Sequence, residues 1–132
     1  MTGVQTCALP IYAFDDMKGG EIYVKKIPSM KVTDVALAVD ENTKQEEVGI
    51  RPGEKLHEQM IGIEDALYTY EYPRHFKILP SINDWAKDET RIGDGIRVPE
   101  NFKYTSDNNK EWMKISELHD WIELNKAKIG NI

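Results

Sequence analysis

The sequence predicts an α/β fold, followed by a β-hairpin and a terminal helix. Three observations support this prediction. In the first half, two short runs of β-branched, aromatic or apolar residues are each followed by a segment of helical character. In the second half, aromatic and polar residues alternate, which is typical of paired strands. Residues 112–124 then carry apolar side chains at helical spacing, which predicts the last helix.

The first strand and helix follow directly from local residue preferences. Residues 12–18 have the composition of a helix end, and Gly19-Gly20 supplies its stop. Residues 21–24 predict a strand because they are mainly β-branched or aromatic. Ser29 is a suitable N-cap for a helix from Met30 to about Asp40. Apolar residues recur there every three or four positions, so the helix has one apolar face.

A second strand and helix are expected around the middle of the chain. Residues 47–50 form an apolar run that predicts a strand, and Pro52-Gly53 ends it. Residues 54–60 then predict a helix that begins at Glu54. This strand–helix–strand–helix order is typical of an α/β layer.

The second half predicts a hairpin, a loop and the terminal helix. Its aromatic and apolar residues alternate with polar ones on both sides of a Pro-Arg pair, which predicts a β-hairpin with one aromatic face. These alternating positions are Tyr68, Tyr70, Tyr72, Phe76 and Ile78. Residues 83–99 are charged and without a clear period, so we expect a mobile loop whose role is open. The terminal helix, residues 112–124, is expected to dock on a partner surface.

Composition excludes several functional classes. The chain has 132 residues, of which 40% are hydrophobic and 30% charged, which is typical of a soluble globular domain. A formal charge of −6 argues against a nucleic-acid partner. No apolar run has the length of a membrane span, and no basic segment precedes Lys18 as in a secretory signal. We therefore expect no nucleic-acid or membrane partner and a cytoplasmic location.

The sequence contains no visible catalytic, cofactor-binding or metal-binding centre. A single cysteine, Cys7, excludes an internal disulfide and offers no metal cluster. The three histidines are far apart and match no metal-binding pattern. Gly19-Gly20 and the glycines of residues 93–95 lack the spacing of a dinucleotide-binding or phosphate-binding loop. We predict no catalytic, cofactor or metal residue in this chain.

The first residues have an unusual composition. Residues 1–11 resemble the in-frame translation of a sequencing-library adapter. We interpret this segment as a non-native leader and residues 12–132 as the genuine protein portion.

Arg51 and Glu54 are the candidate binding residues. The guanidinium of Arg51 can donate to two phosphate oxygens at once, and Glu54, three positions later, can accept hydrogen bonds from sugar hydroxyls. A nucleotide sugar needs both kinds of contact. An exposed turn with a solvated ion pair explains the same four residues equally well, and Lys55 is interpreted as a solvated lysine.

Four segments of the chain resemble a known enzyme family. They are MKGGEIYVKKIPS (17–29), VGIRPGEKLHE (48–58), YTYEYPRHFKILPSI (68–82) and FKYTSDNNKEWM (102–113). Together they resemble the C-terminal part of the inverting UDP-N-acetylglucosamine 4,6-dehydratases. This family belongs to the extended short-chain dehydrogenase/reductase superfamily and acts in the first step toward pseudaminic acid.

The resemblance implies a fold, a substrate and a cofactor. It implies that the chain is the C-terminal, substrate-binding portion of an extended Rossmann-type lyase whose NADP-binding domain is absent here. Arg51 would neutralise the diphosphate of a UDP-sugar, and Glu54 would hold nucleotide hydroxyls. The parent protein would use NADP and form a homo-oligomer, whereas this portion alone would bind no NADP and be inactive. One departure is Lys114, which stands where the family places a Thr or Ser cap before the last helix.

Two other interpretations are left open by the residues. One is a portion of a capsule-type nucleotide-sugar dehydratase or epimerase. The other is a stand-alone, non-catalytic binding module that uses the hairpin and the Trp-bearing helix as its contact surface. If the chain is a portion of a larger sheet protein, exposed strand edges should make a soluble monomer hard to obtain.

Overall fold

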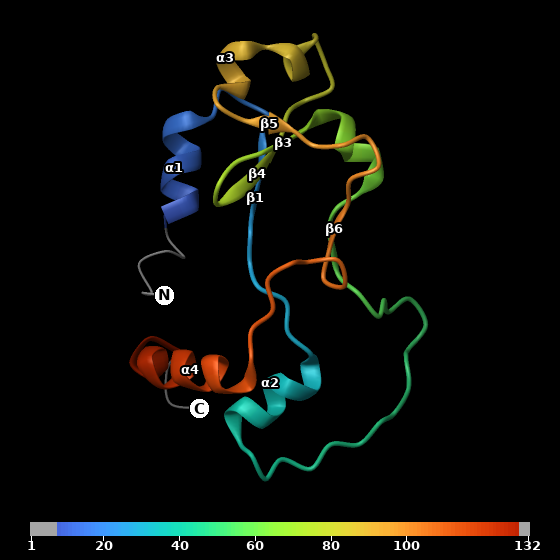
Figure 1. Ribbon diagram of the computed structural model, residues 1–132, viewed down its shortest axis with the longest axis vertical. Helices are drawn as coiled ribbons and strands as arrows, with labels where there is room; N and C mark the ends of the chain where they lie inside the picture. The colour runs from blue at the N-terminus through green and yellow to red at the C-terminus, as the bar shows by residue number, and fades with distance from the viewer. Residues whose placement is uncertain (1–7, 130–132) are drawn as a thin grey trace. The chain divides into compact units, whose positions relative to one another are not determined.

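The computed structural model describes residues 8–129 (Figure 1). These residues divide into two compact units, each made from two separate stretches of the chain. Unit 1 contains residues 8–26 and 59–105, and unit 2 contains residues 27–58 and 106–129. Both helices and strands are present, which confirms the predicted α/β class with a hairpin and a terminal helix.

Unit 1 is built on an antiparallel sheet of four strands with the order β1-β4-β3-β5 (Figure 1). Its strands are β1 (Ile22–Lys25), β3 (Thr69–Glu71), β4 (His75–Ile78) and β5 (Ile96–Arg97). A second, two-stranded sheet pairs β2 (Gln59–Ile61) with β6 (Tyr104–Thr105). Helix α1 (Ala8–Asp16) precedes β1, and the 3-10 helix η2 (Ile63–Tyr68) precedes β3.

The predicted hairpin is confirmed as β3 and β4, but its two strands do not share one aromatic face. Tyr70 lies opposite Lys77, and Glu71 lies opposite Phe76. Residues directly opposite each other in an antiparallel pair point to the same side of the sheet. Tyr70 and Phe76 therefore lie on opposite faces, because the register of the hairpin is shifted by one residue from the one that the alternation suggested.

The two faces of this sheet have separate apolar cores. One contains seven buried residues, namely Val24, Ile61, Ala66, Phe76, Ile78, Val98 and Tyr104. The other contains Tyr70, Tyr72 and Leu79. Burying a large apolar side chain stabilises a fold by about 1.5–3 kcal/mol. Strand β4 is buried on both faces, so it is the centre of unit 1.

Residues 83–99 are not the structureless loop that the sequence predicted. They form the 3-10 helix η3 (Trp85–Lys87), the short helix α3 (Glu89–Ile92) and strand β5. Asp88 caps α3, because its side chain accepts a hydrogen bond from the Thr90 N–H. The sequence shows no period here because each element is shorter than two helical turns.

The start of unit 1 agrees with the predicted helix stop and strand. Helix α1 ends at Asp16, and Gly19 and Gly20 follow with φ of 114° and 83°. Glycine favours these positive φ values, so the chain can turn there into β1. Of the predicted leader, residues 8–11 lie in α1, while residues 1–7, including Cys7, lie outside the described residues.

Unit 2 consists of helices α2 (Val32–Val39) and α4 (Ile115–Ile129), which pack on each other (Figure 1). His119 of α4 places its Nδ1 atom 2.9 Å from the Ala38 carbonyl oxygen, one of the last four carbonyls of α2. The terminal helix is confirmed, although it begins at Ile115 instead of Trp112.

The predicted N-cap of the first helix of unit 2 is wrong. Lys31 precedes α2, and Ser29 lies further upstream in an isolated parallel bridge with Trp112. The Ser29 N–H donates to the Glu111 carbonyl oxygen at 2.8 Å, and the Met113 N–H donates to the Ser29 carbonyl oxygen at 2.9 Å. These long-range bonds fix Ser29 in extended backbone, so α2 starts later than the local preference indicated.

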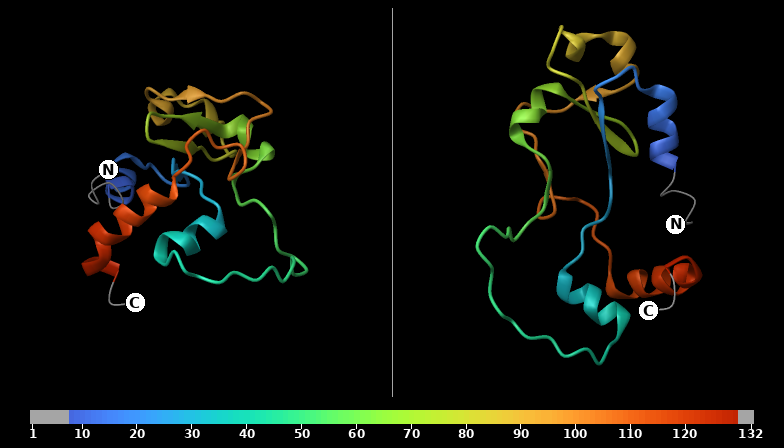
Figure 2. Two further views of the ribbon diagram at one scale, coloured as in Figure 1. Left: turned by 60° about the horizontal axis from the view of Figure 1, so that its bottom comes forward. Right: turned by 180° about the vertical axis from the view of Figure 1, so that it is seen from behind.

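The second predicted strand and helix are also wrong. Residues 47–50 form no strand and residues 54–60 form no helix; the segment runs as a long loop until β2 begins at Gln59 (Figure 2). Gly49 has a φ of 79°, which interrupts an extended run. A short helix is stable only when it packs on an apolar surface. The side chains of residues 44–58 are exposed, so the predicted helix would lack this stabilisation.

Among residues 8–129, no helix combines the length and the hydropathy that a membrane span requires.

Candidate functional site

Arg51 and Glu54 stand at the two ends of a tight turn in the loop of unit 2. The Glu54 N–H donates to the Arg51 carbonyl oxygen at 3.1 Å, which closes the turn. Gly53 has a φ of 90° and follows Pro52, the residue order that a type II turn requires. In the opposite direction, the Arg51 N–H donates to Glu54 Oε2 at 3.0 Å. The two predicted site residues are therefore neighbours through two reciprocal hydrogen bonds.

The side chains of this turn face solvent. Arg51, Glu54 and Lys55 are all exposed. Within the described part of the chain, the Arg51 guanidinium forms no ion pair, and Glu54 Oε1 receives no hydrogen bond. The Arg51 guanidinium and Glu54 Oε1 are thus available to bind a ligand. The turn does not start the helix that was expected to begin at Glu54.

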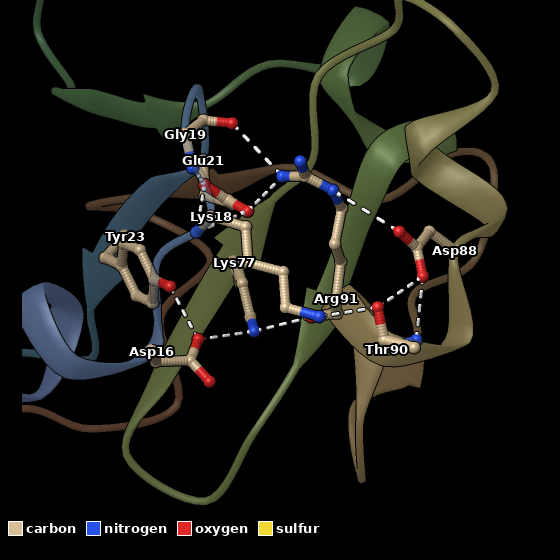
Figure 3. A network of polar contacts seen from close by, with 9 residues as sticks. All are labelled: Asp16, Lys18, Gly19, Glu21, Tyr23, Lys77, Asp88, Thr90 and Arg91. Carbon is tan, nitrogen blue, oxygen red and sulfur yellow. Dashed lines mark hydrogen bonds and ion pairs between the residues drawn. The ribbon is translucent and has the colours of Figure 1, made fainter.

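A second group of charges lies buried in unit 1 and was not identified from the sequence (Figure 3). Arg91 Nη1 donates to Glu21 Oε1 and also to the Gly19 carbonyl oxygen at 3.1 Å. Their side chains are 8% and 2% exposed, so this ion pair is withdrawn from water. Lys77, 3% exposed, donates to Asp16 Oδ2 at 2.7 Å.

This buried network joins four elements of unit 1 to one another (Figure 3). Lys77 on β4 also donates to the Arg91 carbonyl oxygen at 2.7 Å. The Tyr23 hydroxyl of β1 donates to Asp16 at the end of α1. At the edge, Lys18 Nζ donates to Thr90 Oγ1 of α3. The buried charges Lys77 and Arg91 are each paired with a carboxylate of the same unit, so the network holds these elements together.

The carboxylates of the network are held in their charged form. Burial raises the pKa of Asp16, but hydrogen bonds from Lys77 and Tyr23 outweigh burial, so its pKa is lowered. Burial likewise raises the pKa of Glu21, and backbone N–H groups together with Arg91 reverse this and lower it. The half-buried Asp16 and the buried Glu21 therefore both remain ionised.

His75 lies beside this network in an aromatic environment. Its ring stacks on Tyr72 with centroids 4.6 Å apart, and the rings of Tyr12 and Tyr23 contact it as well. Its Nε2 atom is buried without a hydrogen-bond partner in the described residues. Burial, then the charge of Lys77, lowers the pKa of His75. Burial also raises the pKa of Tyr72 to about 12, so neither group is charged near neutral pH.

The described residues offer no candidate metal centre, since no group of three His, Cys, Asp or Glu side chains gathers there. A signal for the buried network was absent from the sequence, because Arg91 and Glu21 are 70 positions apart.

Comparisons with known proteins give the family. A sequence profile described as "Polysaccharide biosynthesis protein" matches residues 1–80. The chain belongs to this polysaccharide biosynthesis protein family. Two Campylobacter jejuni proteins named UDP-N-acetylglucosamine 4,6-dehydratase (inverting) are similar to it. One is 46% identical over 110 residues, and the other, from a second strain, is 45% identical over 114 residues.

A solved structure has a similar fold. The crystal structure of Pen from Bacillus thuringiensis matches 96% of this chain with a TM-score of 0.70 and 30% identity. The chain spans only about a third of the two curated relatives, 33% and 34% of their lengths, and 37% of Pen. The similarity to inverting UDP-N-acetylglucosamine 4,6-dehydratases expected from the four sequence segments is confirmed.

Proposed function

We propose that this chain is the UDP-sugar-binding portion of an NADP-dependent, C5-inverting UDP-N-acetylglucosamine 4,6-dehydratase, a lyase of surface-glycan or pseudaminic acid biosynthesis. The observation that carries the proposal is the exposed turn at Arg51 and Glu54, on a chain whose relatives bear that enzyme name. The parent protein would be a cytoplasmic homo-oligomer.

Each residue of the turn has a distinct part in the proposed binding. Arg51 donates from its guanidinium to oxygens of the diphosphate, which gives charge-assisted hydrogen bonds. Glu54 keeps Oε1 for a nucleotide hydroxyl, while Oε2 accepts from the Arg51 backbone. The whole chain carries a charge of −6, so it repels a diphosphate at long range and needs this local cation.

NADP is not assigned to these residues. A dinucleotide site requires a glycine-rich turn between a strand and the N-terminus of a helix. Between residues 8 and 129, β1 leads through a loop to α2 with no glycine between them, and the four-stranded sheet is antiparallel. These residues do not fit NADP, so we place hydride transfer and its cofactor in another part of the parent protein and predict that this chain alone is inactive.

The proposal is tested by measuring UDP binding calorimetrically. Arg51→Ala should weaken binding about 10- to 100-fold, because a lost hydrogen bond between charged groups is worth roughly 1.5–3 kcal/mol. Lys55→Ala is the matched control: it removes the same charge from the same exposed loop and should change affinity little. Equal affinities of wild type and Arg51→Ala, or equal losses in both variants, would contradict a specific role for Arg51.

A further inference from the structure

The turn with Arg51 lies in a loop whose described hydrogen bonds to the rest of unit 2 are at its two ends. At the start, Gln45 Nε2 donates to the Thr33 carbonyl oxygen at 3.1 Å. At the end, Glu58 forms two hydrogen bonds with Ser106, one from its N–H to Oγ at 3.1 Å and one from its carbonyl oxygen to the Ser106 N–H at 2.8 Å. The intervening residues, 46–57, are exposed and have no regular secondary structure.

Inside this loop, the described hydrogen bonds are the two that join Arg51 and Glu54. One runs between backbone groups and closes the turn. The other uses the Glu54 carboxylate and reaches back to the Arg51 N–H. Because the side chains of residues 46–57 are exposed, the direction in which the loop presents the Arg51 guanidinium depends on this pair of bonds.

We infer that Glu54 is a positioning residue for Arg51: its carboxylate fixes the backbone from which the guanidinium projects. This inference rests on the proposed function and assigns Glu54 a task besides contact with the nucleotide. A hydrogen bond to an ionised carboxylate is stronger than a neutral one. Fixing the turn before the ligand arrives removes part of the ordering cost that binding would otherwise carry. Glu54 thereby contributes to affinity even for ligands that it does not touch.

Two variants with the same charge isolate this contribution. Glu54→Gln keeps a side-chain oxygen that can accept from the Arg51 N–H, whereas Glu54→Ala has no acceptor. Both remove the negative charge, so the difference between them reports the hydrogen bond and not electrostatic repulsion of the ligand. The probes are UDP and inorganic pyrophosphate, which has the phosphates but no ribose.

We expect Glu54→Gln to bind pyrophosphate several-fold more tightly than Glu54→Ala, and UDP by at least the same factor, because UDP also offers the hydroxyls that Glu54 is proposed to contact. In an Arg51→Ala background, the Gln and Ala variants should bind pyrophosphate equally, because positioning has no effect once the guanidinium is gone. A difference seen with UDP but not with pyrophosphate would show that Glu54 only contacts the ribose, and would overturn the inference. Equal binding by Glu54→Gln and Glu54→Ala would overturn it as well.

Amide hydrogen exchange at Arg51 separates this inference from the proposed function, because it needs no ligand. Glu54→Ala should speed exchange of the Arg51 amide several-fold, and Glu54→Gln should leave it close to the wild-type rate. If wild type binds neither UDP nor pyrophosphate, the proposed function fails, while slow exchange that depends on the side-chain acceptor still supports the ordered turn. An Arg51 amide that exchanges equally fast in all three proteins contradicts the positioning role.

Discussion

The protein contains two arginine–glutamate pairs in opposite environments. Arg91 and Glu21 are buried in unit 1, 70 residues apart in sequence, and their side chains form an ion pair. Arg51 and Glu54 are exposed in unit 2, three residues apart, and the carboxylate contacts the backbone of the arginine instead of its guanidinium. The same two residue types thus neutralise each other in one unit and remain available in the other.

This difference shows that burial decides whether an arginine–glutamate pair stabilises the fold or remains free to bind a ligand. Taking charges out of water is unfavourable unless they are paired, so Arg91 and Glu21 need each other to be buried at all. An exposed arginine has no such requirement, and its guanidinium can pair with an incoming phosphate. The residues that stabilise unit 1 and the residues proposed to bind ligand are therefore expected to respond differently to mutation.

The largest effect is expected from Arg91→Ala. It leaves the Glu21 carboxylate buried without its ion-pair partner, and breaking a buried pair in this way destabilises a protein by about 3–5 kcal/mol. Urea unfolding measures the change in the free energy of unfolding. The matched control, Arg51→Ala, removes the same side chain from an exposed site and should change that free energy by less than about 0.5 kcal/mol. Similar losses in both variants would remove the distinction between the two pairs.

A pH dependence of stability should arise from the buried network in unit 1. The pKa of His75 is lowered in the folded state, so below its ordinary value of about 6.5 the unfolded chain binds a proton that the folded chain does not. Stability then falls as the pH drops below about 6.5. The lowered pKa values of Asp16 and Glu21 add stability that is present above about pH 4–4.5 and is lost as the pH falls further.

Unfolding experiments on two histidine variants locate the first part of this effect. His75→Phe keeps an aromatic ring against Tyr72 but cannot take up a proton, so its free energy of unfolding should change less between pH 7 and 5.5 than that of the wild type. His57→Asn, in the exposed loop, should behave like the wild type. An unchanged pH slope in His75→Phe would assign the acid sensitivity to other groups.

The smallest expected effect concerns the start of α4. The Lys114 N–H donates to Glu117 Oε2 at 2.9 Å, which is half of a capping box, but lysine supplies no side-chain acceptor of its own. Lys114→Ser should complete the box and raise the free energy of unfolding by about 0.5–1 kcal/mol. In Glu117→Ala, which cannot form the box, the same serine should stabilise less. If Lys114→Ser lowered the free energy of unfolding, the native lysine would make a contact that stabilises the protein more than the serine cap does.

The elements with strong local signals were predictable from the sequence. The stop at Gly19-Gly20, strand β1, the hairpin and the terminal helix depend on glycine conformation, β-branched residues and apolar spacing, all of which are local. The turn at Arg51 and Glu54 was also visible, because Pro-Gly specifies it. Its proposed ligand came from a family resemblance, and the role of the two side chains is still a prediction.

The remaining features depend on contacts between distant parts of the chain. Ser29 is held away from α2 by bonds to Glu111 and Met113, more than eighty residues later. Residues 54–60 were expected to form a helix, but their side chains are exposed; residues 54–58 stay in a loop, and Gln59 and Met60 join β2, which pairs with β6. Arg91, placed by the sequence in a mobile loop, is instead fixed by Glu21. In each case the presence or absence of contacts with distant residues overrode the local preference.

The most direct test is to record amide and arginine side-chain NMR signals of the wild-type chain while UDP is added. The account predicts that the signals which move most belong to residues 48–56, with the Arg51 guanidinium foremost, and that those of Glu21 and Arg91 stay in place. Shifts concentrated at Glu21, Lys77 and Arg91, with an unaffected Arg51, would contradict it.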